Sequence, residues 1–214
     1  ADLSKYGNNG TCSLALTNCP VINSTSGKYG GGTWFDGSND YINIPDSNSL
    51  DLTTAGTISV WAYKRAQNSY QMYVTKGVVS GATEYQIMDY LTTGRISFRW
   101  GSDVENLVTD EVVQTGSWNH IVGVYNGTNL MIYINGRLSK MIAYTTNAVP
   151  NADPVRIGQR SDGIGTANYW FTGSIDEVRI YNRSLSPNEV NILYKSNLMK
   201  FNQTQWYLQV NQSL

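Results

Sequence analysis

Charged residues are scarce in this 214-residue sequence, with 15 Lys and Arg, 16 Asp and Glu, and a formal net charge of −1. Nucleic acids and acidic membrane surfaces attract clustered positive charge, so this balance argues against either as a partner. No run of about 18 apolar residues occurs, so we expect no membrane-spanning helix. One histidine and two cysteines offer too few ligands for a zinc site.

Turn-forming residues are abundant instead, and clean helical periodicity is rare. Short alternating segments recur about every ten residues, which is typical of a β-sandwich or jelly roll. In "GTISVWAYKR" (56–65), alternation places Ile58, Val60 and Ala62 on one face and Ser59, Trp61 and Tyr63 on the other. We therefore predict an all-β jelly-roll sandwich of two antiparallel sheets.

Local turn and helix signals divide the chain further. Asn126-Gly127 and Asn135-Gly136 each stand between alternating runs, the strongest short hairpin signal. Ser186-Pro187-Asn188-Glu189 has the pattern of a capping box with proline at the first helical position, so one short helix is expected near the C-terminus. These signals predict a jelly-roll domain over 1–195, followed by a tail over 196–214.

Inward positions can be read from the alternation in "TWFDGSNDYINIP". There we expect Phe35, Tyr41 and Ile44 to face the core. His120, in "SWNHIVGVY", lacks a nearby Ser or Cys nucleophile motif. It is therefore interpreted as a structural, hydrogen-bonded histidine at the start of a strand.

The two cysteines, Cys12 and Cys19, have six residues between them in a polar loop, and we predict a disulfide. Disulfides favour an extracellular or cell-surface protein. Glycosylation motifs point the same way but weakly, because a chain rich in Asn, Ser and Thr produces several by chance. The six N-x-S/T sequons begin at Asn9, Asn23, Asn126, Asn182, Asn202 and Asn211.

Four stretches in order carry a family resemblance: "DLSKYGNNGT", "GKYGGGTWFDGSNDYINIP", "GSWNHIVGVYNGTNLMIYINGR" and "GSIDEVRIYNRSLSPNEVNILY". Together they are similar to laminin-G-like domains of the concanavalin A-like lectin and glucanase superfamily, over about residues 2–195. The resemblance implies a jelly roll that serves as a binding or adhesion module on extracellular proteins. It also implies glycan or cell-surface protein ligands and, often, a structural calcium.

Two adjacent acids, Asp176 and Glu177, lie in the expected closing strand. Strict alternation would place Asp176 on the inward face together with Val178, and Glu177 on the face toward solvent. A carboxylate that faces inward needs a hydrogen-bonding or charged partner. The resemblance implies that Asp176 binds calcium, and loop oxygens would complete such a site. Hydrogen bonds that pin a loop are the alternative partner. The candidate loop ligands are Asp2, Asn8, Asp36, Gly37 and Asp40.

A bound glycan would stack on aromatic rings and meet planar polar groups. Trp61 and Tyr63 on the outer face of the 56–65 strand, with Tyr85 and Arg99 beside them, are the candidates. The alternative is that these aromatic side chains fill the sandwich or a second small core.

An enzyme is the competing class. A retaining glycoside hydrolase needs two carboxyl groups about 5–5.5 Å apart, which one strand supplies by alternating acids. The nearest approach is Asp103 and Glu105, in a segment with loop character, while Asp110 and Glu111 are adjacent and point apart. The sequence therefore favours a non-catalytic binding module.

The ends of the chain raise a third possibility. The chain opens at Ala1-Asp2 inside the first matched loop, so the first strand that the resemblance implies is missing. That strand pairs with the closing strand, here 174–181, whose free edge would invite strand addition. In the tail, "QTQWYLQVNQ" (203–212) alternates with Trp206, Leu208 and Val210 on one face. We predict a strand there that completes a sheet in this chain or in a neighbouring copy, as in a structural subunit of a surface assembly. The alternative is that the tail is a linker or the start of a following domain.

Overall fold

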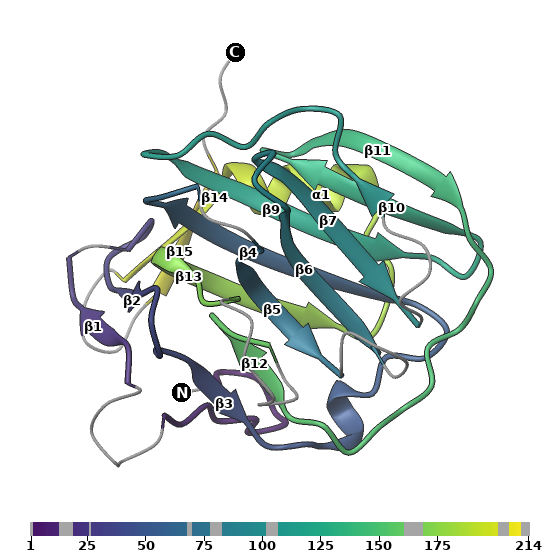
Figure 1. The fold of residues 1–214 in the computed structure, drawn as a ribbon, viewed down its shortest axis with the longest axis horizontal. Coiled ribbons are helices and arrows are strands. Elements are labelled where there is room, and N and C mark those ends of the chain that lie inside the picture. Colours follow the sequence, from purple (N-terminus) through teal and green to yellow (C-terminus); the bar gives the residue numbers. More distant parts are fainter. Residues whose placement is uncertain are drawn as a thin grey trace.

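A computed structural model describes residues 2–12, 19–25, 27–67, 70–77, 83–101, 107–160, 169–200 and 206–210. Two antiparallel sheets face one another, as predicted for a jelly-roll sandwich, with one short helix behind them (Figure 1). Among the described residues, no helix has the length and apolar character needed to cross a bilayer.

The larger sheet has seven strands, and the closing strand lies inside it rather than at its edge. In spatial order the strands are β1 (Val21–Asn23), β2 (Gly32–Asp36), β13 (Thr172–Tyr181), β4 (Gly56–Lys64), β9 (Trp118–Tyr125), β10 (Asn129–Ile134) and β11 (Arg137–Ala143). The two Asn-Gly turns join β9 to β10 and β10 to β11, as predicted.

The second sheet has six strands and faces the viewer in Figure 1. In spatial order they are β3 (Ile42–Ile44), β12 (Val155–Ile157), β5 (Met72–Lys76), β6 (Tyr85–Tyr90), β7 (Arg95–Trp100) and β8 (Leu107–Val108). A short 3₁₀ helix, η1 (Asn48–Leu50), precedes β4.

The core fills the space between the sheets. Ile58, Val60 and Ala62 face it, as alternation predicts. Gly123 on β9 lets Phe98 pack directly on the backbone, because a Cβ there would lie 2.4 Å from the Phe98 ring. Phe35 and Ile44 are buried as predicted, but Tyr41 is not in this cluster and lies half-exposed.

The helix α1 (Pro187–Lys195) begins as its sequence predicts. The Ser186 hydroxyl accepts from the Glu189 amide, and the Glu189 carboxylate accepts from the Ser186 amide. Val190 is buried against Val122 and Tyr133, so the helix covers the outer face of the seven-stranded sheet.

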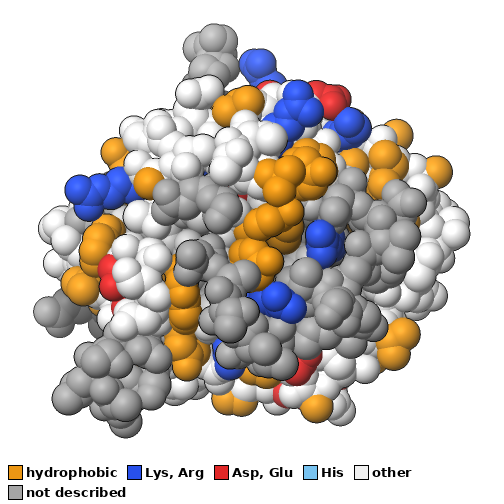
Figure 2. Space-filling model, viewed as in Figure 1, with side chains coloured by type: hydrophobic (Ala, Val, Ile, Leu, Met, Phe, Trp, Pro, Cys, Tyr) orange, Lys and Arg blue, Asp and Glu red, His pale blue; other side chains and the backbone are white. Residues whose placement is uncertain are grey.

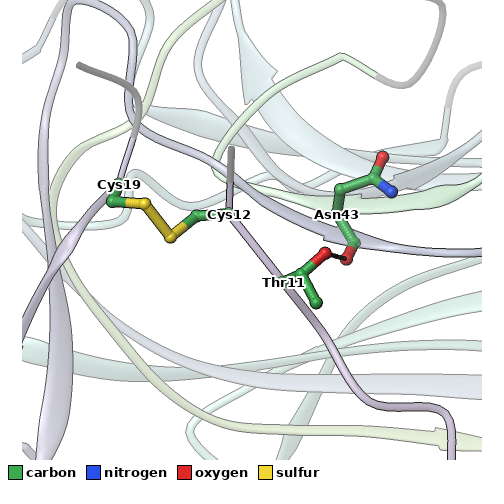
Figure 3. Close-up of a disulfide and its surroundings, with 4 residues drawn as sticks. All are labelled: Thr11, Cys12, Cys19 and Asn43. Carbon is green, nitrogen blue, oxygen red and sulfur yellow. Dashed lines mark hydrogen bonds between the residues drawn. A yellow bond between two sulfur atoms is a disulfide. The ribbon is translucent and has the colours of Figure 1, made fainter. Parts of the chain in front are cut away.

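The predicted disulfide is present between Cys12 and Cys19, whose Cα atoms are 5.1 Å apart (Figure 3). The neighbouring Thr11 forms an isolated bridge with Asn43 of β3, with amide-to-carbonyl distances of 2.8 and 2.7 Å. Thr11, and with it the adjacent Cys12, is thereby held at the edge of the six-stranded sheet.

The tail contains the predicted strand, but its partner is different. β15 (Trp206–Val210) pairs with β14 (Ser196–Lys200) as a separate two-stranded sheet, so the tail is not a further strand of either main sheet. β14 directly follows the helix and is the strand nearest to β15 in sequence. The edge predicted to be free is partly covered: β2 pairs with β13 from Thr172 to Ile175, and past Ile175 β13 pairs with β4 alone among the described strands.

A buried ammonium group holds one end of the sandwich together. Lys76 Nζ lies 2.9 Å from Asp46, 3.0 Å from Asp51, 3.0 Å from Glu84 and 2.6 Å from the carbonyl oxygen of Asn151. Burial alone would lower the pKa of Lys76, but the three carboxylates outweigh it and raise that pKa. Lys76 is therefore a buried cation surrounded by oxygens.

Candidate functional site

A row of polar side chains crosses the outer face of the six-stranded sheet. Strand register places its members side by side, one from each of five adjacent strands: Asn43, Arg156, Thr75, Gln86 and Arg99. The row exists because side chains alternate between faces along each strand. On β12, for example, Val155 and Ile157 face the core and leave Arg156 between them facing outward.

The row is ordered by its own contacts. Arg156 donates from Nε to Asn43 Oδ1 (3.4 Å), and from Nη1 to Gln159 Oε1 (2.8 Å) and the Arg160 carbonyl (3.1 Å). With its amide oxygen turned toward Arg99, Gln86 accepts from Arg99 Nε and Nη1, each at 3.2 Å. These contacts hold planar donors and acceptors in fixed positions.

Aromatic rings lie beside the β3 end of this row. Tyr41 and Trp170 contact each other with ring centroids 6.2 Å apart, and the Arg156 guanidinium lies 4.9 Å from the Tyr41 ring centre. Tyr70 and Tyr169 form a second, edge-to-face pair at 5.4 Å. All four rings are half-exposed. Figure 2, viewed from this side, shows hydrophobic side chains in a band with Lys or Arg groups beside it.

This face combines half-exposed rings with amide, hydroxyl and guanidinium groups, of which Asn43 and Arg156 are half-exposed while Thr75, Gln86 and Arg99 are buried. Sugars present apolar C–H faces and ring hydroxyls, which stack on aromatic rings and hydrogen-bond to planar polar groups respectively. The half-exposed part of this face, around Arg156, Tyr41 and Trp170, is therefore chemically suited to a polyhydroxylated ligand. Thr75 contributes a further feature: it is fully buried, and its hydroxyl has no hydrogen-bond partner in the part of the chain described.

The four residues predicted to bind a ligand are not brought together. Trp61 and Tyr63 lie on β4 of the seven-stranded sheet, whereas Tyr85 and Arg99 lie on the six-stranded sheet. Tyr85 was assigned to the wrong face: it is fully buried in the core, and its hydroxyl donates to the Leu50 carbonyl at 3.1 Å. Only Arg99 belongs to the polar row.

Trp61 belongs to a second aromatic cluster, which agrees with the alternative prediction that these aromatic side chains fill a second small core. Its ring is 4% exposed and stacks on His120 at 5.0 Å and on Tyr194 of α1 at 5.6 Å, with Lys28 Nζ 4.5 Å from its ring centre. Tyr63 is half-buried against Trp118 at 5.9 Å. The helix and the segment around Lys28 cover Trp61, so it is closed to a ligand in this structure.

Asp176 does not share a face with Val178, contrary to strict alternation. A β-bulge between Asp176 and Arg179 inserts one residue, and Glu177 there adopts a positive φ of 51°. Asp176 pairs with Trp61 on the outer face, while Val178 packs against the core. Glu177 forms an ion pair with Arg179 and is half-buried.

The Asp176 carboxylate acts as a loop anchor in this structure. Oδ2 accepts from the Tyr29 amide at 3.1 Å and Oδ1 from the Glu177 amide at 2.8 Å. Burial is the largest influence on the carboxyl and raises the pKa of Asp176, partly offset by these amide donors. These contacts are those of the predicted alternative, in which Asp176 pins a loop by hydrogen bonds instead of binding calcium.

The predicted calcium ligands do not assemble around Asp176. Asp36 lies opposite Thr172, four residues along β13 from Asp176, or about 13 Å. The carboxylate of each of these loop acids already accepts hydrogen bonds from backbone amides of its own loop. Asp2 accepts from Ser4 and Asn8, and Asp36 accepts from Ser38 and Asn39. Asp40 accepts from the Asp36 amide near Gly37. In the described ranges no group of three or more Asp, Glu, His or Cys side chains is arranged to hold a metal ion. These residues do not fit a calcium ion, so calcium stays a prediction from the resemblance.

Two of the four acids considered for glycoside hydrolysis, Asp110 and Glu111, are engaged in contacts with β11. Asp110 is ion-paired with Lys140 at 2.7 Å, and Glu111 accepts from the Ser139 hydroxyl at 2.5 Å. Asp103 and Glu105 lie outside the described residues.

Four of the six sequon asparagines are exposed: Asn9, Asn23, Asn126 and Asn182. Asn202 and Asn211 lie outside the described residues. His120 is buried and 2.9 Å from Ser59 Oγ, which confirms its structural interpretation.

Comparison with known proteins agrees with the fold. The model of the concanavalin A-like lectin/glucanases superfamily matches residues 36–191, well over half of the chain. The chain belongs to this superfamily. The chain is also similar in sequence to human pentraxin-related protein PTX3. The two are 27% identical over 115 residues, which are 50% of this chain. Those residues correspond to 30% of PTX3, so the chain spans about a third of that protein.

Two solved structures share the superfamily fold. The binding domain of Paraclostridial Mosquitocidal Protein 1 has a TM-score of 0.70 and 19% identity, over 92% of this chain and 50% of that one. Domain 4 of AbnA, a GH43 extracellular arabinanase from Geobacillus stearothermophilus, was solved with arabinotriose. It has a TM-score of 0.63 and 18% identity, over 87% of both chains. At these identities the likeness shows the fold alone.

Proposed function

We propose that this domain is a non-catalytic glycan-binding module that acts outside the cell, and that its ligand lies on the outer face of the six-stranded sheet. The observation that carries the proposal is the polar row flanked by the half-exposed pair Tyr41 and Trp170. The disulfide favours an oxidising compartment. The arabinotriose complex of AbnA domain 4 supports sugar binding on this fold.

A glycan array with the full chain tests the proposal. Trp170→Ala should weaken binding about fivefold or more, because a stacked ring adds about 1 kcal/mol beyond the area it buries. Trp118→Ala is a matched control, since Trp118 is also half-exposed but lies on the seven-stranded sheet. Equal effects of the two substitutions, or no glycan bound by the unchanged protein, would contradict the proposal.

The open part of β13 favours a second candidate role, association by strand addition. Beyond Ile175 this strand pairs with β4 alone among the described strands, and Val178 and Ile180 are only partly buried. A free strand edge with apolar neighbours can accept a strand from another copy or from a cell-surface protein. Light scattering on the full chain and on a chain ending at residue 195 tests whether the tail mediates self-association. A monomer at all concentrations in both would remove this role.

A further inference from the structure

Arg156 is a half-buried cation whose contacts are all to neutral groups. Several other buried or half-buried cations are neutralised by carboxylates: Lys64 pairs with Asp89, Lys76 with three carboxylates, and Arg179 with Glu177. Arg156 contacts only two amide oxygens, a backbone carbonyl and the Tyr41 ring. Removing a charge from water without a counter-charge costs free energy. A ligand that carries a negative charge would offset this cost for the Arg156 guanidinium.

The contacts leave one side of the guanidinium available. Nε and Nη1 make the three hydrogen bonds, and within the described ranges none comes from Nη2. The bonds to Asn43, Gln159 and Arg160 fix the plane of the group without cancelling its charge. A guanidinium held in this way is pre-organised for an anion, because little side-chain entropy remains to be lost on binding.

A second donor lies next to it on the same face. Thr75 is the register partner of Arg156 across β5 and β12, which places their Cβ atoms about 4.5–5.5 Å apart. Its hydroxyl is fully buried and unpartnered in the described structure. A buried hydroxyl without a partner costs free energy that a ligand oxygen can recover.

We propose that the glycan bound on the polar row is acidic, and that a carboxylate on one of its sugars accepts hydrogen bonds from Arg156 Nη2 and the Thr75 hydroxyl. This inference rests on the proposed glycan-binding function and specifies its ligand class. The Tyr41 and Trp170 rings beside Arg156 would stack on the apolar face of the same sugar. The overall net charge of −1 makes the preference a property of this site and not of the whole surface.

The test uses the full chain on an array that pairs glucuronate-, galacturonate- and sialate-terminated glycans with their carboxyl-reduced neutral counterparts. The expected result is binding to at least one acidic glycan and about ten- to a hundredfold weaker binding to its reduced form, the range for a hydrogen bond to a charged group. Arg156→Gln should lower affinity for the acidic glycan by a similar factor and leave the reduced form almost unaffected. Thr75→Val should give a smaller loss, again confined to the acidic glycan.

The outcomes separate the two proposals. If the unchanged protein binds neutral and carboxylated glycans equally, or if Arg156→Gln weakens both equally, the acidic ligand is wrong while glycan binding stands. Binding to no glycan would overturn both. Arg156→Lys keeps the charge but not the planar group, and should recover part of the affinity lost in Arg156→Gln. Melting curves of each variant show whether a loss of binding comes from loss of the fold.

Discussion

The stability of this domain should fall on mild acidification because of one residue, His120. It is the only histidine in the chain, is 1% exposed, and contacts the rings of both Trp61 and Tyr194. Nε2 meets Ser59 Oγ, and Nδ1 has no partner in the described structure. Burial, and then the positive charge of Arg179, lower the pKa of His120 to about 3. The native state therefore keeps the ring neutral.

The sign of the effect follows from linkage. In the unfolded chain the histidine pKa is about 6.5, so below that pH the unfolded state takes up a proton that the native state excludes. The stability that neutral His120 provides is complete above pH 6.5 and is lost as the pH falls toward 3. Between pH 7 and pH 5 the expected loss is about 2 kcal/mol, and the slope rises toward about 1.4 kcal/mol per pH unit as the pH falls below 6.5.

Urea denaturation of the natural protein and of His120→Gln at pH 7, 6 and 5 measures this loss. The glutamine amide can still bond to Ser59 but does not titrate. Carboxylic acids titrate in both proteins, so the difference between their pH dependences isolates the histidine. The natural protein should lose about 2 kcal/mol more than the variant between pH 7 and 5. Parallel losses in the two proteins would refute a buried neutral histidine.

Three further outcomes are expected from the contacts described. Trp61→Ala should destabilise the fold by about 3–5 kcal/mol in chemical denaturation, as for other buried tryptophans, without abolishing glycan binding; loss of binding with unchanged stability would restore its predicted ligand role. Lys76→Met should cost about 3–5 kcal/mol, since it leaves buried carboxylates unpaired; a variant of unchanged stability would contradict that account. Asp176→Asn should lower the melting temperature equally with and without a chelator if the lost contacts are hydrogen bonds; a chelator response lost in the variant, with metal found by elemental analysis, would support the predicted calcium instead.

Local signals in the sequence predicted the elements well. The Asn-Gly pairs mark the two hairpins of β9, β10 and β11, and the Ser186–Glu189 capping box marks the helix, because each is set by a few neighbouring residues. Alternation also predicted the faces of β4. It failed on β13, where the bulge at Glu177 shifts the register by one residue. A bulge depends on the strands on either side, which the sequence of one strand does not display.

The candidate site was largely missed for a related reason. Its row takes one residue from each of five strands, and β12 lies between β3 and β5 although it comes far later in the chain. That order decides which polar residues become neighbours, and it follows from the packing of the whole sandwich. "PVRIGQR" did show one usable signal, since Arg156 alternates with two apolar residues and must face outward. Tyr41 was expected inside, but it lies on the outer face beside Arg156.

The oxygen cage around Lys76 has a consequence for where the domain can work. A metal ion would bind and dissociate according to its concentration in the surroundings, whereas the ammonium group is covalently attached through the Lys76 side chain and cannot be diluted away or chelated. The contacts from Asp46, Asp51, Glu84 and Asn151 converge on it from separate segments of the chain. That end of the sandwich should therefore keep its shape in calcium-poor and calcium-rich fluids alike.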